Sequence, residues 1–220
     1  MAKKIATQRR NENGDIVFED HLRGTTTMLA KKIDSMPFLI ATLNAYTDYA
    51  TSTVTRNIPR VEDGLKLVTR RLLHELRTFT TNTKSAKIIG NVLGSLHPHG
   101  DTACYGALVS TGPISSYQYL HHQGNWGTLL EGDSPAAMRY TECKVSNNYT
   151  NLYDLESMNS APTVPNFDGT IQEPYLIISK IPMLLLNDTW GNTVGYSSNI
   201  PSHNQREVIE ACIASIKAGY

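Results

Sequence analysis

Residues 65–79 read LKLVTRRLLHELRTF, and the central part of the chain is organised around this stretch. Apolar side chains recur in it every three or four residues, which is the spacing of one side of an amphipathic helix. They are Leu65, Val68, Leu72, Leu76 and Phe79. Basic residues occupy other positions, namely Lys66, Arg70, Arg71 and Arg77. We therefore predict a helix that packs through its apolar side and offers a basic side to a partner.

Two shorter helices are predicted after this one. Residues 85–93 carry apolar side chains at helical spacing, and Gly94 is suited to close the helix because glycine adopts the left-handed conformation common at helix ends. A third helix follows Gly100, with Asp101 as a suitable N-cap residue. Consecutive short helices of this kind are typical of a helix-turn-helix, in which the second helix is offered to DNA.

The two ends of the chain show other patterns. Residues 1–38 are polar and predict an N-terminal arm, either mobile or docked to a partner, and residues 39–54 predict a helix. Beyond Ser146, apolar runs at 175–178, 183–186 and 193–196 are typical of strands separated by turns. Residues 207–217 predict a final helix, whose buried side would contain Val208, Ile209, Cys212, Ile213 and Ile216.

Charge is balanced over the whole chain but not along it. The sequence has 20 Lys+Arg and 20 Asp+Glu, which alone argues against a DNA-binding protein. Residues 56–87, however, contain eight Lys/Arg and only three Asp/Glu. A basic segment of this kind is suited to meet phosphates, and a solvated helix face is the alternative interpretation.

Cysteine usage and hydropathy indicate the compartment. The three cysteines lack metal-like spacing, which favours reduced thiols over a zinc site or a disulfide framework. No apolar run approaches the length of a membrane span, and the first residues lack the apolar core of a signal peptide. We therefore expect a cytoplasmic protein without a membrane partner.

Residues 132–142 read GDSPAAMRYTE and contain the candidate nucleophile, Tyr140. A tyrosine hydroxyl has an ordinary pKa of about 10, so it needs a neighbour that favours the phenolate or the charge on its target. Arg139 is such a neighbour, because its guanidinium stays charged and its fork of donors matches phosphate oxygens. The pair predicts phosphoryl chemistry rather than acyl chemistry, although most Arg-Tyr pairs are surface or packing features.

Further motifs surround this pair in a fixed order. They are RNIP at 56–59, EDGLK at 62–66, Arg70-Arg71, KSAK at 84–87, HPHGD at 97–101, QGNWG at 123–127, AAMRYTE at 136–142, PNFDGT at 165–170, QEP at 172–174 and NIPSHN at 199–204. In this order the motifs resemble the breakage-reunion subunit of type IIA DNA topoisomerases, above all the bacterial gyrase A and topoisomerase IV subunits. The resemblance covers roughly residues 45–211.

The resemblance implies an α+β fold in three parts. Residues 1–38 would form the N-terminal arm. Residues 39–150 would form a winged-helix DNA-gate domain that contains the catalytic tyrosine and a helix-turn-helix. Residues 151–220 would form the beginning of a tower-like α/β domain, which in the family continues beyond the length of this chain.

The same resemblance assigns roles to single residues. Tyr140 would attack a backbone phosphate and become linked to the 5′ end, with Arg139 holding the phosphate and Arg56 and His99 assisting there. His97 is interpreted as structural. Ile200 would bend DNA as a wedge between base pairs. The expected DNA-binding residues are Lys66, Arg70, Arg71, Lys84, Lys87, Thr102, Gln123, Asn125 and Ile200.

Cofactors and partners also follow from the resemblance. The activity would be that of an ATP-hydrolysing type II topoisomerase, with Mg²⁺ and ATP both bound by a partner subunit and no metal residue in this chain. The chain would bind double-stranded DNA, form a homodimer across the DNA gate, and require the ATPase and metal-binding subunit. A separate polypeptide would supply the C-terminal gate.

Two other functions remain open from the sequence. The first is a winged-helix DNA-binding protein without catalysis, and the second is a fragment that docks to a topoisomerase. The sequence does not distinguish supercoiling from relaxation or decatenation, nor a naturally short chain from a split one. The compact size and the N-terminal arm would suit a phage enzyme encoded in separate pieces as well as a bacterial one.

Overall fold

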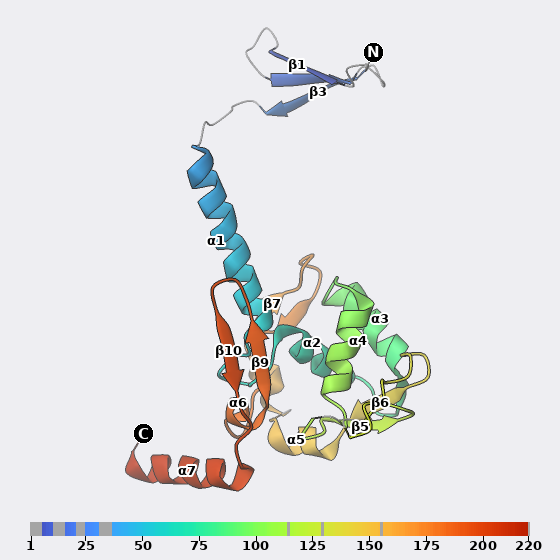
Figure 1. The fold of residues 1–220 in the computed structure, drawn as a ribbon, viewed down its shortest axis with the longest axis vertical. Helices are drawn as coiled ribbons and strands as arrows, with labels where there is room; N and C mark the ends of the chain where they lie inside the picture. The colour runs from blue at the N-terminus through green and yellow to red at the C-terminus, as the bar shows by residue number, and fades with distance from the viewer. Residues whose placement is uncertain are drawn as a thin grey trace. The chain divides into compact units, whose positions relative to one another are not determined.

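The structure is a computed structural model that describes residues 6–10, 16–20, 25–30, 37–113, 115–128, 130–154 and 156–219. It has two compact units, Met1–Asp48 and Tyr49–Tyr220, and the division falls inside the long helix α1 (Phe38–Asn57). Helices and small antiparallel sheets share the chain, which confirms the α+β class (Figure 1). Residues on both sides of the boundary expected at 150 belong to the second unit.

The N-terminal unit contains a sheet that the sequence did not predict. Strands β1 (Ala6–Arg10), β2 (Ile16–Asp20) and β3 (Thr25–Ala30) pair antiparallel in that order, with a bulge between Ile16 and Val17. Residue types that are enriched in strands occur in this sheet, namely isoleucine and valine in β2 and threonine in β3.

The long helix was predicted from 39 to 54 and extends from Phe38 to Asn57. Leu43, Tyr46 and Tyr49 repeat along it at helical spacing, yet all three are exposed. In its last turns Thr53 is buried within the second unit.

Three predicted helices form the centre of the second unit. These are α2 (Leu67–Leu76), α3 (Ser85–Ser95) and α4 (Asp101–Ser110). Asp101 is the first residue of α4 rather than its N-cap, and its carboxylate accepts from the N–H of Thr102 at 2.7 Å. A three-stranded antiparallel sheet accompanies the helices in the order β4 (Thr83–Lys84), β6 (Glu142–Val145), β5 (Leu120–Gln123).

The core of this unit is built from the apolar side of α2. Leu72, Leu73 and Leu76 are fully buried, and they share the core with Ile88 of α3 and Leu108 of α4. Each such side chain contributes about 1.5–3 kcal/mol through burial. The amphipathic spacing of residues 65–79 therefore does position the three helices, as predicted.

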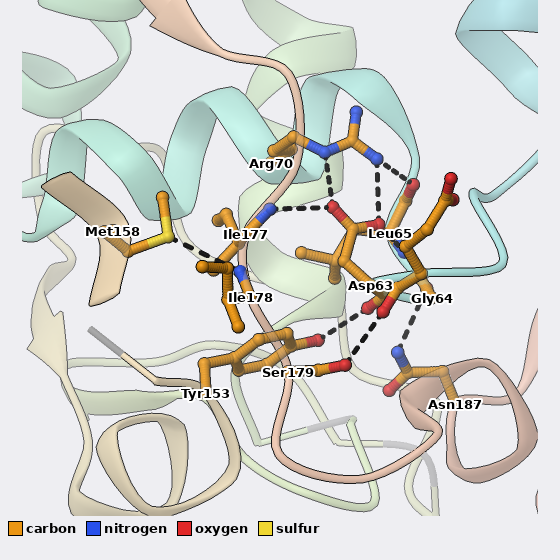
Figure 2. A network of polar contacts seen from close by, with 11 residues as sticks. Asp63, Gly64, Leu65, Arg70, Tyr153, Met158, Ile177, Ile178, Ser179 and Asn187 are labelled. Carbon is orange, nitrogen blue, oxygen red and sulfur yellow. Dashed lines mark hydrogen bonds and ion pairs between the residues drawn. The ribbon is translucent and has the colours of Figure 1, made fainter. Parts of the chain in front are cut away.

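The loop before α2 joins this core to the later part of the chain (Figure 2). Asp63 accepts two hydrogen bonds from Arg70, at 2.5 and 2.9 Å, and one from the N–H of Ile177 at 3.1 Å. The Tyr153 hydroxyl donates to the Asp63 carbonyl at 3.0 Å. Asn187 donates to the carbonyl of Gly64 at 3.1 Å. These bonds attach Tyr153, Ile177 and Asn187 to the loop before α2.

The region after β6 contains short elements. They are α5 (Asn147–Leu152), the 3₁₀ helix η1 (Ser157–Ser160), β7 (Thr163–Pro165), β8 (Gln172–Pro174), α6 (Met183–Leu186), β9 (Thr189–Asn192), β10 (Ser197–Ile200) and α7 (Gln205–Ala218). Strands β7 and β8 form one antiparallel pair, and β9 and β10 form another.

The three strands predicted in this region are wrong. Residues 183–186 form helix α6, because methionine and leucine are good helix formers and Pro182 precedes them. Residues 193–196 form the turn between β9 and β10, where Gly195 has a φ of 81°. Residues 175–178 lie outside the named strands. Apolar runs alone did not distinguish strands from these alternatives.

The final helix α7 is confirmed, with longer bounds. Asn204 caps it, because its side-chain oxygen accepts from the N–H groups of Arg206 and Glu207. Val208 is buried, but Ile213 and Ile216 are exposed. The prediction that both isoleucines lie on a buried side is therefore wrong within this chain.

Candidate active site

The backbone at Tyr140 passes from solvent into the core within one residue. The Tyr140 side chain is 61% exposed, whereas Thr141 is fully buried. The N–H of Tyr140 donates to the carbonyl of Ala137 at 2.8 Å and closes a turn. The guanidinium carbon of Arg139 lies 4.7 Å from the centroid of the Tyr140 ring. A phenol and a permanent cation therefore stand together at the surface, on a backbone whose next residue is fixed.

The first turn of α3 holds the segment that contains Tyr140. The N–H groups of Ser85 and Ala86 donate to the carbonyls of Thr141 and Met138, at 2.9 and 3.1 Å. The first N–H groups of a helix have no acceptor within that helix. The segment supplies the missing acceptors, so its position is tied to the position of α3.

Three hydroxyl groups form a chain beneath this backbone, and we call Tyr105, Thr141 and Ser85 the hydroxyl chain. The Tyr105 hydroxyl, from α4, donates to the carbonyl of Ala136 at 2.7 Å and lies 3.0 Å from the Thr141 hydroxyl. Thr141 Oγ1 donates to Ser85 Oγ at 2.8 Å. Because Ser85 and Thr141 are fully buried, this paired network rigidifies the backbone beside Tyr140.

The glycine-rich loop at 123–127 packs against the same segment. A Cβ atom at Gly124 would lie 3.0 Å from the carbonyl oxygen of Tyr140, and Gly124 has a φ of 91°. A Cβ atom at Gly127 would lie 2.6 Å from the carbonyl oxygen of Asp133. The Asn125 carbonyl accepts from the N–H of Ala136 at 3.0 Å. The two glycines are thus needed for close approach of the two backbones.

A second pair of predicted site residues meets at the end of α1. Arg56 Nη1 lies 3.1 Å from His99 Nε2. Arginine is always protonated, so Arg56 donates and His99 Nε2 accepts, which places the proton of neutral His99 on Nδ1. His99 is exposed and Arg56 is half-buried, so both are open to a ligand.

His97 supports His99 from the core side. The two rings are stacked with centroids 4.3 Å apart. Arg71 donates to His97 Nδ1 at 2.8 Å and to both carboxylate oxygens of Glu173, at 2.6 and 2.5 Å. Burial, together with the nearby His99, Arg71 and Arg56, lowers the pKa of His97 to about 4. His97 is therefore neutral at physiological pH, in keeping with a structural role.

The other predicted DNA contacts differ in how free their side chains are. Lys66 donates to the Trp190 carbonyl at 2.5 Å, and burial lowers the pKa of its ammonium group. Lys84 pairs with Glu142 at 2.7 Å. Lys87 lies 5.4 Å from the centroid of the Phe79 ring. Exposed side chains belong to Thr102, Gln123 and Asn125, and Ile200 is half-buried.

Arg70 corrects one prediction. It is 2% exposed, and its donors are used by Asp63 and by the carbonyl of Leu65 (Figure 2). A buried guanidinium paired in this way is unable to reach a phosphate, so the predicted DNA contact by Arg70 is wrong. For Arg71, whose donors meet Glu173 and His97, a DNA contact stays a prediction.

The structure thus brings two pairs of predicted residues together, Arg139 with Tyr140 and Arg56 with His99. Within the described residues no hydrogen bond joins one pair to the other. Sequence reasoning missed the hydroxyl chain and the role of Glu173. The available signal was a tyrosine hydroxyl among small apolar residues of α4, at Tyr105, and a glutamate inside the QEP motif.

The described residues contain no group of three or more His, Cys, Asp or Glu side chains that would hold a metal ion. They also contain no helix long and apolar enough to cross a membrane.

Comparison with known proteins identifies one family. The model for the A subunits of DNA gyrase and topoisomerase IV matches residues 56–219. The A subunit of DNA topoisomerase 4 from Escherichia coli (strain K12) is 44% identical over 183 residues, which is 80% of this chain and 24% of that protein. The DNA gyrase A subunit of Buchnera aphidicola subsp. Baizongia pistaciae (strain Bp) is 43% identical over 197 residues, or 86% of this chain and 23% of that protein. The chain thus spans about a quarter of the length of these relatives.

Proposed function

The chain belongs to the family of DNA gyrase and topoisomerase IV A subunits, and we propose that it is the DNA-cleavage and religation subunit of a type IIA topoisomerase. Tyr140 would form a reversible 5′-phosphotyrosyl link that opens a double-strand DNA gate. The environment of Tyr140 supports this proposal most directly. Its phenol is exposed beside Arg139, while helix α3, the hydroxyl chain and the glycine loop fix the backbone around it.

The proposed reaction exchanges one phosphodiester for another. The Tyr140 oxygen attacks a backbone phosphorus, the bond from phosphorus to the 3′ oxygen breaks, and the 5′ phosphate stays on the tyrosine. The phenol loses one proton and the leaving 3′ oxygen gains one. Because bond energy is retained in the phosphotyrosyl link, the 3′ hydroxyl can attack it and reseal the strand without external fuel.

Arginine and histidine would stabilise the charge that develops on the phosphorus oxygens. Catalysis of phosphoryl transfer consists mostly of positioning and electrostatic stabilisation. Arg139, whose guanidinium carbon lies 4.7 Å from the centroid of the Tyr140 ring, would hold the phosphate there. Arg56 and His99 would assist there as a pair, with His97 keeping the His99 ring in place by stacking.

The arrangement of the second unit fits the family fold that we propose for it. Helices α3 and α4 follow each other closely beside the sheet β4-β6-β5, as in a winged helix, and α4 would be the helix offered to DNA. Its first turn carries the exposed Thr102. The residues from about 151 onward would begin the tower domain.

Partners complete the proposal. We propose that a partner subunit binds Mg²⁺. ATP would be bound by the same ATPase subunit. The chain would bind double-stranded DNA in the cytoplasm as a homodimer. We further propose that a separate polypeptide supplies the C-terminal gate.

The test is a trapped covalent adduct. The 220-residue chain is mixed with DNA, Mg²⁺ and the partner subunit, then denatured, and protein attached to labelled DNA is counted. Tyr140→Phe should abolish the adduct because only the nucleophilic oxygen is lost. Tyr175→Phe is the matched control: Tyr175 is also partly exposed beneath an arginine, with Arg60 3.6 Å from its ring centroid. It should form the adduct normally.

Three results would contradict the proposal in whole or in part. An adduct that persists in Tyr140→Phe would place the nucleophile elsewhere. A chain that binds DNA without forming any adduct would favour the alternative function, which is a non-catalytic winged-helix DNA-binding or topoisomerase-docking fragment. An adduct formed by the chain alone, and lost in Tyr140→Phe, would keep Tyr140 but overturn the division of labour between subunits.

A further inference from the structure

A cavity of about 670 Å³ lies between the end of α2, the strands β5 and β6, and the start of α5. None of the residues that we propose for DNA contact or for the cleavage reaction lines it. A volume of this size accommodates a small molecule rather than a single ion. The cavity is therefore a second concave site, and it shares no residue with the candidate active site.

The lining of this cavity is basic. It includes Arg77, Lys144 and His121, and none of its residues is an aspartate or a glutamate. The register of the sheet places His121 directly opposite Lys144, so these two side chains lie on the same face. Amide groups from Asn147 and Asn148 also line the cavity. Cations and neutral donors without a competing carboxylate favour an anionic ligand.

Arg77 and Lys144 differ from neighbouring cations in how their charges are balanced. Arg70 and Arg71, which precede Arg77 on α2, both pair with carboxylates, and so does Lys84 of the same sheet as Lys144. Within the described residues, the side chains of Arg77 and Lys144 have no ion pair and no hydrogen bond. Both side chains are half-buried, so each has lost part of its hydration. An anion in the cavity would balance both charges.

A buried hydroxyl near Arg77 supports the same assignment. Tyr149 is fully buried, and its hydroxyl has no hydrogen-bond partner among the described residues. Burial raises the pKa of this phenol, and the nearby charge of Arg77 acts in the opposite direction. Helix α5 carries Tyr149 and also supplies Asn147 and Asn148 to the cavity. Because buried polar groups are nearly always hydrogen-bonded, a bound anion, or a water that it holds, would account for this hydroxyl.

We propose that this cavity binds a small molecule that carries two or more phosphate groups. The guanidinium of Arg77 offers a fork of donors to one phosphate group, and the ammonium of Lys144 offers a point charge to a second. The two cations come from different elements, so one ligand would bridge the end of α2 and strand β6. Such a ligand is distinct from the DNA and the ATP of the proposed reaction, and its binding does not depend on that reaction.

The first experiment measures the binding of sodium tripolyphosphate to the 220-residue chain by isothermal titration calorimetry. Arg77→Gln should raise the Kd about tenfold, because charge-assisted hydrogen bonds to phosphate are lost. Lys144→Met should raise it about fivefold, since a single point charge is lost. Orthophosphate should bind more weakly, because it reaches one cation at a time. Lys217→Met is the matched control: Lys217 is exposed on α7 and its loss should leave the Kd unchanged.

Two further variants separate ligand contact from a structural role. Arg77→Lys keeps the charge but loses the fork, so its Kd should lie between those of the wild type and Arg77→Gln. Tyr149→Phe removes a buried hydroxyl that has no partner in the chain. Without ligand, its melting temperature should therefore be unchanged or higher, yet its Kd for tripolyphosphate should rise about threefold, as expected for one neutral hydrogen bond. Thermal unfolding followed by circular dichroism also shows that each variant is folded.

The outcomes separate this cavity from the DNA-binding surface. Wild-type Kd values in both Arg77→Gln and Lys144→Met would overturn the assignment. Weaker binding in Arg56→Gln, with an unchanged Kd in Arg77→Gln, would place the anion at the candidate active site instead.

The affinity for a labelled short duplex, measured by anisotropy, should be unchanged in Arg77→Gln and Lys144→Met. If both variants lose duplex affinity as well, the cavity belongs to the DNA path and the inference fails. Binding of tripolyphosphate by a chain that forms no adduct at Tyr140 would support this site while the proposed function fails.

Discussion

Arg70 and Arg56 belong to the same basic segment, yet the structure uses them in opposite ways. Arg70 lies in the core, and its donors are satisfied by Asp63 and the Leu65 carbonyl (Figure 2). Arg56 is half-buried at the end of α1 and meets an exposed histidine. The difference shows that a count of basic residues includes two kinds of side chain. Side chains of the first kind are buried and join segments of the fold, and those of the second kind remain available to a ligand.

The largest expected effect tests the buried arginine. Arg70→Ala would leave the Asp63 carboxylate buried without its charged partner, so we expect a loss of about 3–5 kcal/mol in the free energy of unfolding. Arg139→Ala removes an exposed guanidinium and should change the free energy of unfolding by less than about 0.5 kcal/mol. Denaturant unfolding followed by circular dichroism measures both. Equal losses of unfolding free energy in the two variants would contradict the distinction between buried and exposed arginines.

The next largest effect is expected at His97, where a fall in pH should lower the free energy of unfolding. The pKa of His97 is lowered from 6.5 to about 4, so the folded state prefers the neutral ring. Its contribution to stability is complete above pH 6.5 and is lost as the pH falls toward 4. Between about pH 7 and pH 5 we expect a loss of about 2 kcal/mol. The His97→Gln variant should have a lower free energy of unfolding at neutral pH, and that free energy should change less between pH 7 and pH 5. If its dependence on pH matches that of the wild type, another group causes the acid sensitivity.

A smaller effect is expected on the rates of DNA cleavage and resealing when the hydroxyl of Tyr105 is removed. Tyr105→Phe keeps the ring that packs near Trp126 but removes the hydroxyl that holds Ala136 and Thr141. If Tyr140 is the nucleophile, looser positioning should slow adduct formation and resealing about tenfold each, equivalent to about 1.4 kcal/mol. Rapid-quench assays give both rates. DNA affinity and the cleavage equilibrium should stay unchanged, and a change in affinity alone would contradict a positioning role.

The smallest effect is expected at Lys84. Its ion pair with Glu142 is largely exposed, at 54% and 30% of the two side chains. Exposed pairs of this kind contribute about 0–1 kcal/mol and are screened by salt. Lys84→Met should therefore change the melting temperature very little, while its effect on DNA affinity should grow at low salt. A stability loss comparable with that of Arg70→Ala would mean that exposure is a poor guide to the role of a cation here.

The sequence predicted the longer helices, α1, α2, α3, α4 and α7, because apolar residues recur in them at helical spacing, whereas the short helices α5 and α6 were not predicted. Residues 65–79 show this most clearly, with Leu72 and Leu76 of α2 fully buried as the spacing requires. The motifs also placed Tyr140 beside Arg139, and they led to the correct family. Order along the chain was sufficient for these conclusions, because they depend on neighbours within a few residues.

Long-range pairing was beyond the sequence. Nothing in Asp63 or Ile177 indicates that a carboxylate and an N–H far apart in the chain meet at 3.1 Å. The same holds for the bond between Arg71 and Glu173, and for the hydroxyl chain that joins α3, α4 and the Tyr140 segment. The short apolar runs after residue 175 failed for a different reason, because runs of this length suit a helix, a turn or a strand equally.

The burial of Thr141 beside Tyr140 has a mechanical consequence. In the proposed reaction, the 5′ end of a cut strand is covalently bonded to the Tyr140 oxygen. Any tension in the DNA is therefore transmitted through this one side chain to the backbone. That backbone is clamped one residue later by Ser85 of α3 and Tyr105 of α4. Tension would therefore be shared by two helices of the core instead of unravelling a loop. The broken end would keep its position while the gate is open, so that it can be rejoined.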